Sequence, residues 1–493
     1  MKLLRLLGTL AVVLLLAACD SYEPPPYNDP PISADSNSKN VIAVSAAANH
    51  TLALLADGTL WSWGHAWGGM SPIGDGTTEN RPRPVQIMQD VVFALAGHDH
   101  SLAITSDGTL WAWGANQFGQ IGDGTTETRL APVPVMENIV YAAMLPTVPN
   151  SHTGAGGWRT YAIDTYGVLW GWGLGGSMGY NPFDVALGDG GGEGRRLLPV
   201  RILENVRTVV PTPQGGLAIT NDSTLWIWHG EIIDANFADG EWHQTTHPAQ
   251  LTPAQLLQNV AAISANGTMA VTTNGTPWDI RRHLLEEIPM DGRIVYAIRH
   301  SNSFFAITDQ DELIAWGENR LFYHWRENVT LGDGTTIDRD TPVVIMTNVA
   351  EIKIMGYNVY VLCHNGGLWT WGVGYHGDWG DIFHDYGHMW EYAFDAEGVL
   401  QGRRWLLDDG GGTGLRLRPE LILDNVASVA PTYNMFDHGW VRAPRAFAVT
   451  TCGTLWAWGN NDIFGQGLSM LGLELGDGTS QHHDTPIAIR IMD

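Results

Sequence analysis

A tryptophan-containing segment recurs along the chain and constrains its fold more than any other feature. The segment His50–Gly64 returns as His100–Gly114, with the same Asp-Gly pair and the same Trp-x-Trp-Gly ending. Further copies end at residues 170–173, 226–228, 369–372 and 456–459, and two weaker copies span residues 268–278 and 304–317. A regular internal repeat indicates one small structural unit that is copied many times. The chain therefore contains eight candidate units.

Each unit has the pattern of about four short β-strands. In the second unit, alternating apolar residues run into Asp107-Gly108, and a second alternating stretch follows this pair. Asp-Gly between two such stretches predicts a tight hairpin in which both turn residues have positive φ. A glycine-rich loop over residues 116–125 and a proline-bounded strand over residues 132–135 complete the unit.

Repeated four-stranded sheets predict an all-β fold, a β-propeller. One such sheet cannot cover its own apolar faces, so the copies must pack face to face and close radially. Because tryptophans recur at the same position of nearly every unit, we interpret them as core residues between blades rather than as a sugar-binding surface. The fifth unit is short, since Trp278 lies close to Ile314 of the sixth. The sequence therefore leaves seven to eight blades open.

The repeat resembles that of a known family. Residues 100–125, from His-Ser-Leu-Ala-Ile-Thr to Gly-Asp-Gly-Thr, look like the regulator of chromosome condensation repeat, and the likeness extends from residue 41 to the C-terminus. The resemblance implies a β-propeller, usually of seven blades. The founding relatives catalyse nucleotide exchange on a small nuclear GTPase and sit on chromatin. The acidity and the predicted export of this chain oppose that role.

The N-terminus has the three-part layout of a secretory signal. A basic start precedes an apolar run that ends at Cys19, and residues 16–19 resemble the lipobox of bacterial lipoproteins. We therefore predict a signal peptide over residues 1–18, a lipidated, proline-rich linker over residues 19–40 that begins with Cys19, and a propeller over residues 41–493. The alternative is an ordinary cleaved signal with an incidental cysteine. Because two acyl chains hold a protein on a bilayer, the predicted location is the extracytoplasmic side of a cell membrane.

Charge and cysteine content bound the partners and the redox chemistry. Acidic side chains outnumber basic ones by 52 to 26, and such a surface repels phosphate backbones. We therefore expect no nucleic-acid partner. Cys363 and Cys452 lie near hairpin turns of consecutive repeats, where both a disulfide and a pair of free thiols are open.

The longest departure from the repeat is an insertion at about residues 375–405, which is the first candidate for a recognition surface. Aromatic side chains are frequent in it, and they supply a large contact area for little lost rotamer freedom. The candidate binding residues are Tyr375, Trp379, Phe383, Tyr386, Trp390 and Tyr392. The structural alternative is a packed flap that covers an irregular blade edge.

Two groups of acidic and histidine residues raise the question of a metal site. The histidines and aspartates of the insertion have no established ligand spacing, and each recurring Gly-Asp-Gly loop offers one carboxylate, too few for calcium. We interpret the loop aspartates as caps of their own turns. These aspartates are Asp75, Asp123, Asp189, Asp333 and Asp477. We expect no metal ion and no cofactor.

The sequence contains no nucleophile elbow, phosphate loop, dinucleotide fingerprint or zinc-protease motif. The leading hypothesis is a membrane-tethered, monomeric, extracytoplasmic binding module that recognises a protein or an envelope glycan through loops on a propeller face. The alternative is a cell-envelope glycan hydrolase or lyase. Two carboxyl groups about 5 to 10 Å apart in a groove would favour that enzyme.

Overall fold

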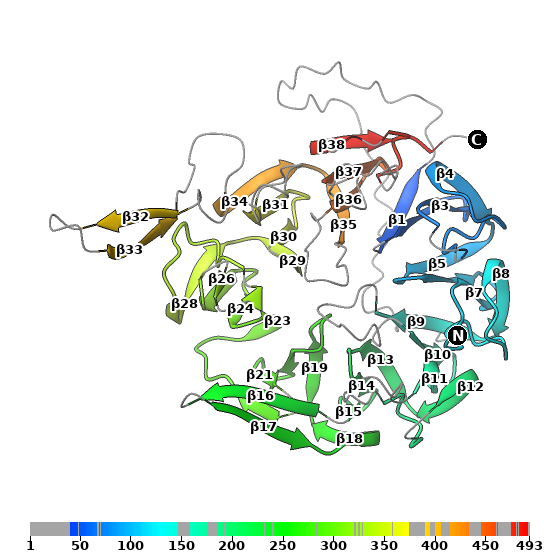
Figure 1. Ribbon diagram of the computed structural model, residues 1–493, viewed down its shortest axis with the longest axis horizontal. Helices are drawn as coiled ribbons and strands as arrows, with labels where there is room; N and C mark the ends of the chain where they lie inside the picture. The colour runs from blue at the N-terminus through cyan, green and yellow to red at the C-terminus, as the bar shows by residue number, and fades with distance from the viewer. Residues whose placement is uncertain are drawn as a thin grey trace.

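The computed structural model describes residues 40–47, 49–66, 69, 71–145, 158–175, 186–191, 194–230, 232–238, 241–281, 284–319, 322–323, 326–327, 329–356, 358–373, 390–394, 400–405, 415–432, 445–459, 461, 475–479, 481 and 483–491. Within these ranges the strands form eight four-stranded antiparallel sheets. Figure 1 shows the sheets as blades around a central axis, with the blue start of the ring beside its red end. The predicted all-β propeller is confirmed, with eight blades.

The four strands of each blade follow chain order from the axis outwards (Figure 1). The innermost strands are β1 (Val41–Ala46), β5 (Val91–Ala96), β9 (Ile139–Met144), β13 (Val206–Pro211), β19 (Val260–Ile263), β23 (Ile294–His300), β29 (Val349–Met355) and β35 (Val426–Thr432). The second strands are β2 (His50–Leu55), β6 (His100–Thr105), β10 (Arg159–Asp164), β14 (Gly215–Thr220), β20 (Met269–Thr272), β24 (Ser303–Thr308), β30 (Asn358–Cys363) and β36 (Arg445–Thr450).

The third and the outer strand of each blade lie farther from the axis. The third strands are β3 (Leu60–Gly64), β7 (Leu110–Gly114), β11 (Leu169–Leu174), β15 (Leu225–His229), β21 (Pro277–Arg281), β25 (Leu313–Gly317), β31 (Leu368–Val373) and β37 (Leu455–Gly459). The outer strands are β4 (Arg81–Met88), β8 (Arg129–Met136), β12 (Arg195–Leu203), β18 (Gln250–Leu257), β22 (Leu284–Glu287), β28 (Arg339–Met346), β34 (Leu415–Leu423) and β38 (His483–Ile489).

Among the described strands, three hairpins lie outside the blades. They are β16 (Ile232–Ala238) with β17 (Glu241–His247), β26 (Phe322–Tyr323) with β27 (Arg326–Glu327), and β32 (Trp390–Phe394) with β33 (Leu400–Trp405). Each is inserted between the third and the outer strand of one blade. No helix in the described part of the chain is long and apolar enough to cross a membrane.

The innermost strands share two features at their start. Six are preceded by an asparagine or aspartate with positive φ, such as Asn138 at 61°, and these side chains tolerate that backbone conformation better than others. The second residue of each innermost strand then forms a bulge in the pairing with the second strand, as Val92 does between Val91 and Phe93. Val92 is 51% exposed, whereas Val91 is buried. The bulge therefore turns one residue outwards at each blade entrance.

The core lies between blades, where the second and third strands are almost wholly buried. The second tryptophan of the repeat is fully buried in most blades, as Trp172 is among Leu102, Ile121 and Ala142. In most blades the first tryptophan is only partly buried, as Trp170 is at the edge of the same cluster. The predicted packing role of the repeated tryptophans between blades is therefore confirmed for the second one of each pair.

The ring closes by packing between the first and the last blade. Val41, Trp63, Phe447 and Ile489 share one buried cluster, and β1 contacts β35 and β36. No described strand is exchanged across this junction, because β1 pairs with β2 and β38 pairs with β37. Each described blade is therefore one continuous segment of the chain.

The hairpin turn between the second and third strands differs from the predicted one. Gly58 has a φ of 80°, but Asp57 does not have a positive φ. Gly58 N–H donates to the carbonyl of Leu55, and Leu55 N–H donates to that of Thr59. These bonds define a three-residue loop in which glycine forms the bulge. The expectation that both turn residues have positive φ was wrong.

Candidate functional site

The two ends of the ring carry different connections. We call one end the hairpin face, because it carries the turns between second and third strands. The links between blades lie at the same end, since Val91 N–H in such a link donates to the carbonyl of Gly58 in such a turn. The other end, here the loop face, carries the links between first and second strands and between third and outer strands. Ala115 N–H donates there to the carbonyl of Asp99. Every connection therefore belongs to one of two faces.

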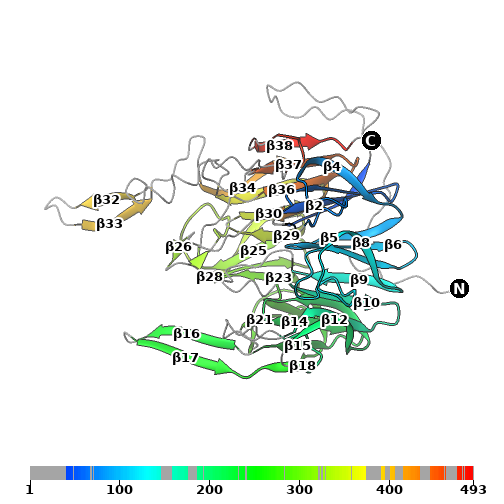
Figure 2. The same cartoon turned by 45° about the vertical axis from the view of Figure 1, so that its right-hand side comes forward.

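Variation in length is concentrated on the loop face. The hairpin-face turns always join the second and third strands across four residues, as at 56–59, 221–224 and 451–454. On the loop face, by contrast, the third and outer strands are joined by residues 282–283 in one blade and by residues 374–414 in another. Figure 2 shows β16–β17 and β32–β33 projecting beyond the body of the ring. The loop face is therefore the candidate functional site, because loops on a rigid scaffold carry most binding sites.

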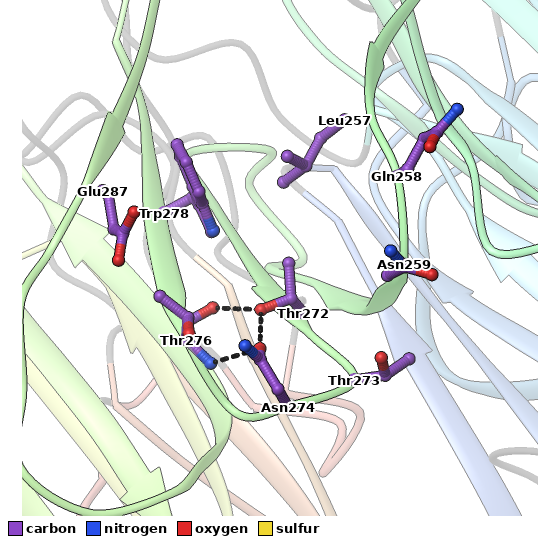
Figure 3. Close-up of a pocket in the computed structure, with 9 residues that line it drawn as sticks. All are labelled: Leu257, Gln258, Asn259, Thr272, Thr273, Asn274, Thr276, Trp278 and Glu287. Atoms are coloured by element: carbon purple, nitrogen blue, oxygen red, sulfur yellow. Dashed lines mark hydrogen bonds between the residues drawn. The ribbon is translucent and has the colours of Figure 1, made fainter.

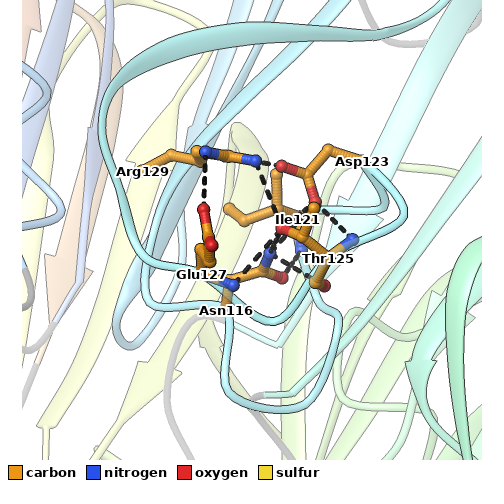
Figure 4. A network of polar contacts seen from close by, with 6 residues as sticks. All are labelled: Asn116, Ile121, Asp123, Thr125, Glu127 and Arg129. Atoms are coloured by element: carbon orange, nitrogen blue, oxygen red, sulfur yellow. Dashed lines mark hydrogen bonds and ion pairs between the residues drawn. The ribbon is translucent and has the colours of Figure 1, made fainter.

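A polar network organises the standard loop of this face, seen in the second blade (Figure 4). Asp123 accepts hydrogen bonds from Thr125 N–H and from Arg129 Nε, at 3.0 and 2.5 Å. Asn116 Nδ2 donates to Asp123 Oδ1 at 3.1 Å, and Asn116 Oδ1 accepts from Ile121 N–H at 3.0 Å. Although burial opposes ionisation, the bonds from Thr125 and Arg129 lower the pKa of Asp123. The aspartate thus stays charged and caps its own turn.

The same network recurs in four other blades. Arg81, Arg196 and Arg339 pair with the loop aspartates of their blades, and His483 takes the place of arginine beside Asp477. The predicted capping role of the Gly-Asp-Gly aspartates is confirmed. Sequence reasoning missed the basic partner, although arginine or histidine follows the aspartate at six or seven residues each time.

The two glycines of the triplet connect each loop to the next blade. Gly124 N–H donates to the carbonyl of Leu197 in β12 at 2.8 Å, a bond that we call the loop latch. A Cβ on Gly122 would lie 2.6 Å from the indole nitrogen of Trp172, which donates to the carbonyl of Gln120. Glycine is therefore required where the loop covers the next tryptophan. Further latches run from Gly76 to Leu130, Gly190 to Leu251, Gly334 to Leu417 and Gly478 to Pro82.

Buried histidines also join neighbouring blades beneath this face. His50 Nε2 lies 2.6 Å from Ser101 Oγ, which itself donates to the carbonyl of Pro72, so His50 is the donor. His100 relates to Thr160 in the same manner. Burial lowers the pKa of His50 to about 3. Because the hydroxyl of Ser101 donates its hydrogen to a carbonyl, Ser101 is not an activated nucleophile. The uncharged His50–Ser101 pair instead links two blades, and we call such a pair a buried brace.

The fifth blade departs from this scheme. Only residues 282–283 separate β21 from β22, so no Gly-Asp-Gly loop is present, and Ile280 stands where other blades have the second tryptophan. Instead, Arg299 of the sixth blade pairs with the buried Asp279 at 3.0 Å. Asn266 Nδ2 adds a bond to the carbonyl of Arg299 at 2.9 Å. A buried ion pair therefore joins the fifth and sixth blades, where five other pairs of neighbouring blades are joined by a loop latch.

Most of the predicted site residues fall outside the described part of the chain. This holds for Cys19 and for Tyr375, Trp379, Phe383 and Tyr386. Trp390 and Tyr392 belong to β32, where their backbones pair with Trp405 and Arg403 of β33. Their role in binding stays a prediction, and so does the lipidation of Cys19.

Two further expectations concern cysteines and metals. Cys363 is buried and Cys452 exposed, and no disulfide joins them, so of the two alternatives the pair of thiols is right. Among the described residues, no group of three histidine, cysteine or acidic side chains could hold a metal ion. The histidines and aspartates of residues 376–388 lie outside that part.

Comparison with protein-family models identifies the repeat. Two models match, and both are described as the regulator of chromosome condensation (RCC1) repeat. One matches residues 41–66 and 95–120, and the other matches residues 57–104. Residues 41–120 therefore carry the regulator of chromosome condensation repeat. The sequence has no match among curated proteins.

The chain is also similar to solved structures. Prp20p of Saccharomyces cerevisiae is 15% identical and has a TM-score of 0.50, with 92% of this chain and 88% of that chain covered. Yeast RCC1 (Prp20) in its complex with Kap60 is 15% identical with a TM-score of 0.47 and coverages of 95% and 91%. Human WBSCR16 is 13% identical with a TM-score of 0.31 and coverages of 92% and 82%. At such identities the likeness to Prp20p establishes the propeller fold alone.

Proposed function

We propose that this chain is a protein-binding module whose recognition surface is the loop face. The observation that carries the proposal is the concentration of every described insertion, β16–β17, β26–β27 and β32–β33, on that one face. Latches and buried braces hold the standard loops beside them rigid, which lowers the entropy lost on binding. Yeast Prp20p, a structural relative, has been studied for its binding to Gsp1p and histones, which supports protein recognition as the class of function.

The proposal includes a tether that directs the loop face away from a bilayer. Val41, at the start of β1, bonds to the carbonyl of Gly453 on the hairpin face, so the chain enters the ring there. A lipidated Cys19 would thus lie on the hairpin-face side, joined by a proline-rich arm of roughly 60 Å at 3.1 Å per residue. Binding of an envelope protein on the extracytoplasmic side would then use the opposite, outward face.

Site-specific photo-crosslinking in cells that produce the full chain tests the binding face. A photoreactive phenylalanine analogue replaces Ile337 or Glu127 on the loop face. Ile337 is 64% exposed as a residue, and the side chain of Glu127 is 78% exposed. The matched control replaces Tyr166, an 83% exposed residue in a hairpin-face turn. We expect one discrete crosslinked protein from the loop-face positions and none from Tyr166. Equal crosslinking from Tyr166, or crosslinking from Tyr166 alone, would contradict the proposal.

The tether has a separate test. Metabolic labelling with an alkyne fatty acid should mark the wild-type chain, and a Cys19→Ser variant should lose both the label and its membrane association. Retention of the label in that variant would exclude Cys19 as the lipidated residue without affecting the choice of face.

A further inference from the structure

A cavity of about 310 Å³ opens on the hairpin-face side of the fifth blade (Figure 3). Its walls are the link that enters the blade, represented by Gln258 and Asn259, the turn at Asn274, and the facing pair Trp278 and Glu287. The short β22 pairs Trp278 with Glu287, where β18 of the fourth blade places Gln255 opposite Trp226. The cavity therefore occurs in the blade that departs most from the repeat.

The indole nitrogen of Trp278 differs from its counterparts. In three other blades this N–H donates to the side chain six residues earlier, as from Trp226 to Thr220 at 3.2 Å and from Trp170 to Asp164 at 2.9 Å. The nitrogen of Trp278 is buried and has no hydrogen-bond partner. Trp456 shares that state, but only Trp278 of the two lines the cavity. An unbonded N–H is costly, so an oxygen that reached it would bind favourably.

The cavity walls combine an aromatic ring with uncharged polar groups. The amides of Gln258 and Asn259 can each donate and accept hydrogen bonds, as a sugar hydroxyl does. The amide oxygen of Asn274 already accepts from Thr272 and Thr276, so this side chain offers its NH₂ group as a donor. The partly buried ring of Trp278 offers an apolar face to the C–H groups of a sugar ring. Glu287 is the one charged side chain in the lining, and its carboxylate would accept from hydroxyls but repel phosphates and other anions.

We propose that this cavity is a binding site for a neutral saccharide, with Trp278 as the stacking residue and Glu287 as the acceptor for hydroxyl groups. The volume lies at the lower end of the usual range for ligand sites, which suits a mono- or disaccharide unit. The lining contains one carboxyl group, whereas glycoside hydrolysis normally requires two, so the site binds without cleaving. The proposal is independent of the loop face and stands if no protein partner binds there.

The test measures direct binding to the purified full chain. The probes are N-acetylglucosamine, glucose, galactose and mannose, with glucose 6-phosphate as the anionic comparison, by saturation-transfer NMR and calorimetry. At least one neutral sugar should bind saturably, with glucose 6-phosphate weaker than glucose. Trp278→Phe keeps a stacking ring but removes the N–H, and we expect about a fivefold lower affinity. Glu287→Gln should weaken binding about tenfold, because hydrogen bonds to charged groups are stronger.

Trp226→Phe is the matched control, since it makes the same change at the same repeat position in the fourth blade, where the N–H is already bonded. It should leave sugar affinity unchanged, and melting curves check that all variants fold. The proposal is overturned if no neutral sugar binds the wild-type chain at its solubility limit, if glucose 6-phosphate binds more tightly than glucose, or if Trp278→Phe binds like wild type.

Discussion

Each residue of the Gly-Asp-Gly triplet has a different physical role in the ring. In the first blade, the carboxylate of Asp75 caps its turn and pairs with Arg81 at 2.5 Å. Gly74 lies against the indole of Trp113 in the next blade, and Gly76 donates the loop latch to Leu130. The triplet thus links the conformation of one loop to the packing of the neighbouring blade.

A pair of glycine substitutions separates the contact with the neighbouring tryptophan from backbone strain. Both Gly74 and Gly76 have positive φ, 91° and 84°, so alanine costs about 1 kcal/mol at either position. A Cβ on Gly74 would lie 2.4 Å from Trp113 Nε1, whereas one on Gly76 meets nothing within 4 Å. Gly74→Ala should therefore lose a further 1 to 3 kcal/mol or so. Urea unfolding checks this, and equal losses from the two variants would show that the indole contact is unimportant.

Some of these residue roles were readable from the sequence and others were not. A lone aspartate between glycines has few explanations other than capping, so the role of Asp123 was predicted correctly. Its partner Arg129 was missed because it lies on the next strand, although the regular spacing in five blades is a visible signal. The turn at Asp107-Gly108 was misjudged because the same dipeptide fits both two-residue and three-residue loops.

At the scale of the element, the fifth blade shows how a degenerate repeat is stabilised. Elsewhere the Gly-Asp-Gly loop of the preceding blade covers the second tryptophan, as Gly122 covers Trp172, and Ile280 takes the place of that tryptophan in the fifth blade. The fourth blade has β16–β17 in the position of that loop. The fifth and sixth blades are joined instead by the ion pair between Arg299 and Asp279, whose side chains are 17% and 1% exposed.

Breaking this ion pair should destabilise the ring strongly. Arg299→Met leaves the buried Asp279 carboxylate without its cation, which typically costs about 3 to 5 kcal/mol. The double variant Asp279→Leu with Arg299→Met should recover much of this loss, since apolar pairs often replace buried ion pairs. Glu204→Gln, which breaks an exposed pair with Arg201, is the control and should change stability by less than about 1 kcal/mol. Thermal unfolding that is equally shifted by Glu204→Gln and Arg299→Met would refute a special role for the seam.

The elements themselves were predictable because their repeat is strong. Even the weak copy at residues 268–278 was placed on a blade, since its hairpin pattern survives the loss of one tryptophan. The cavity beside Trp278 was not foreseen, because it arises from the short β22 and from a tryptophan whose N–H lacks its usual partner. Neither property is visible in the residue pattern of a single strand.

At the scale of the whole molecule, the two faces follow from the even number of strands in a blade. Antiparallel pairing alternates the strand directions, so every link between third and outer strands must emerge at the same end of the ring. The sequence located the longest departure from the repeat, at about residues 375–405, but did not assign it to a face. It also left the blade number open, because the length of one unit does not show whether its strands are complete.

The closing seam is built like the internal ones. Gly478 latches to Pro82 of the first blade as Gly76 latches to Leu130 of the second, and no described strand crosses the junction. The order of the blades along the gene is therefore separable from the geometry of the ring. A circular permutant that begins at Val349 and ends at Met346, with the old termini joined by a flexible linker, should melt within a few degrees of the natural chain. A permutant cut inside the fourth blade, at Asn221 between β14 and β15, should melt well below the natural chain. Its new termini divide one sheet, whereas new termini at Val349 lie between two sheets.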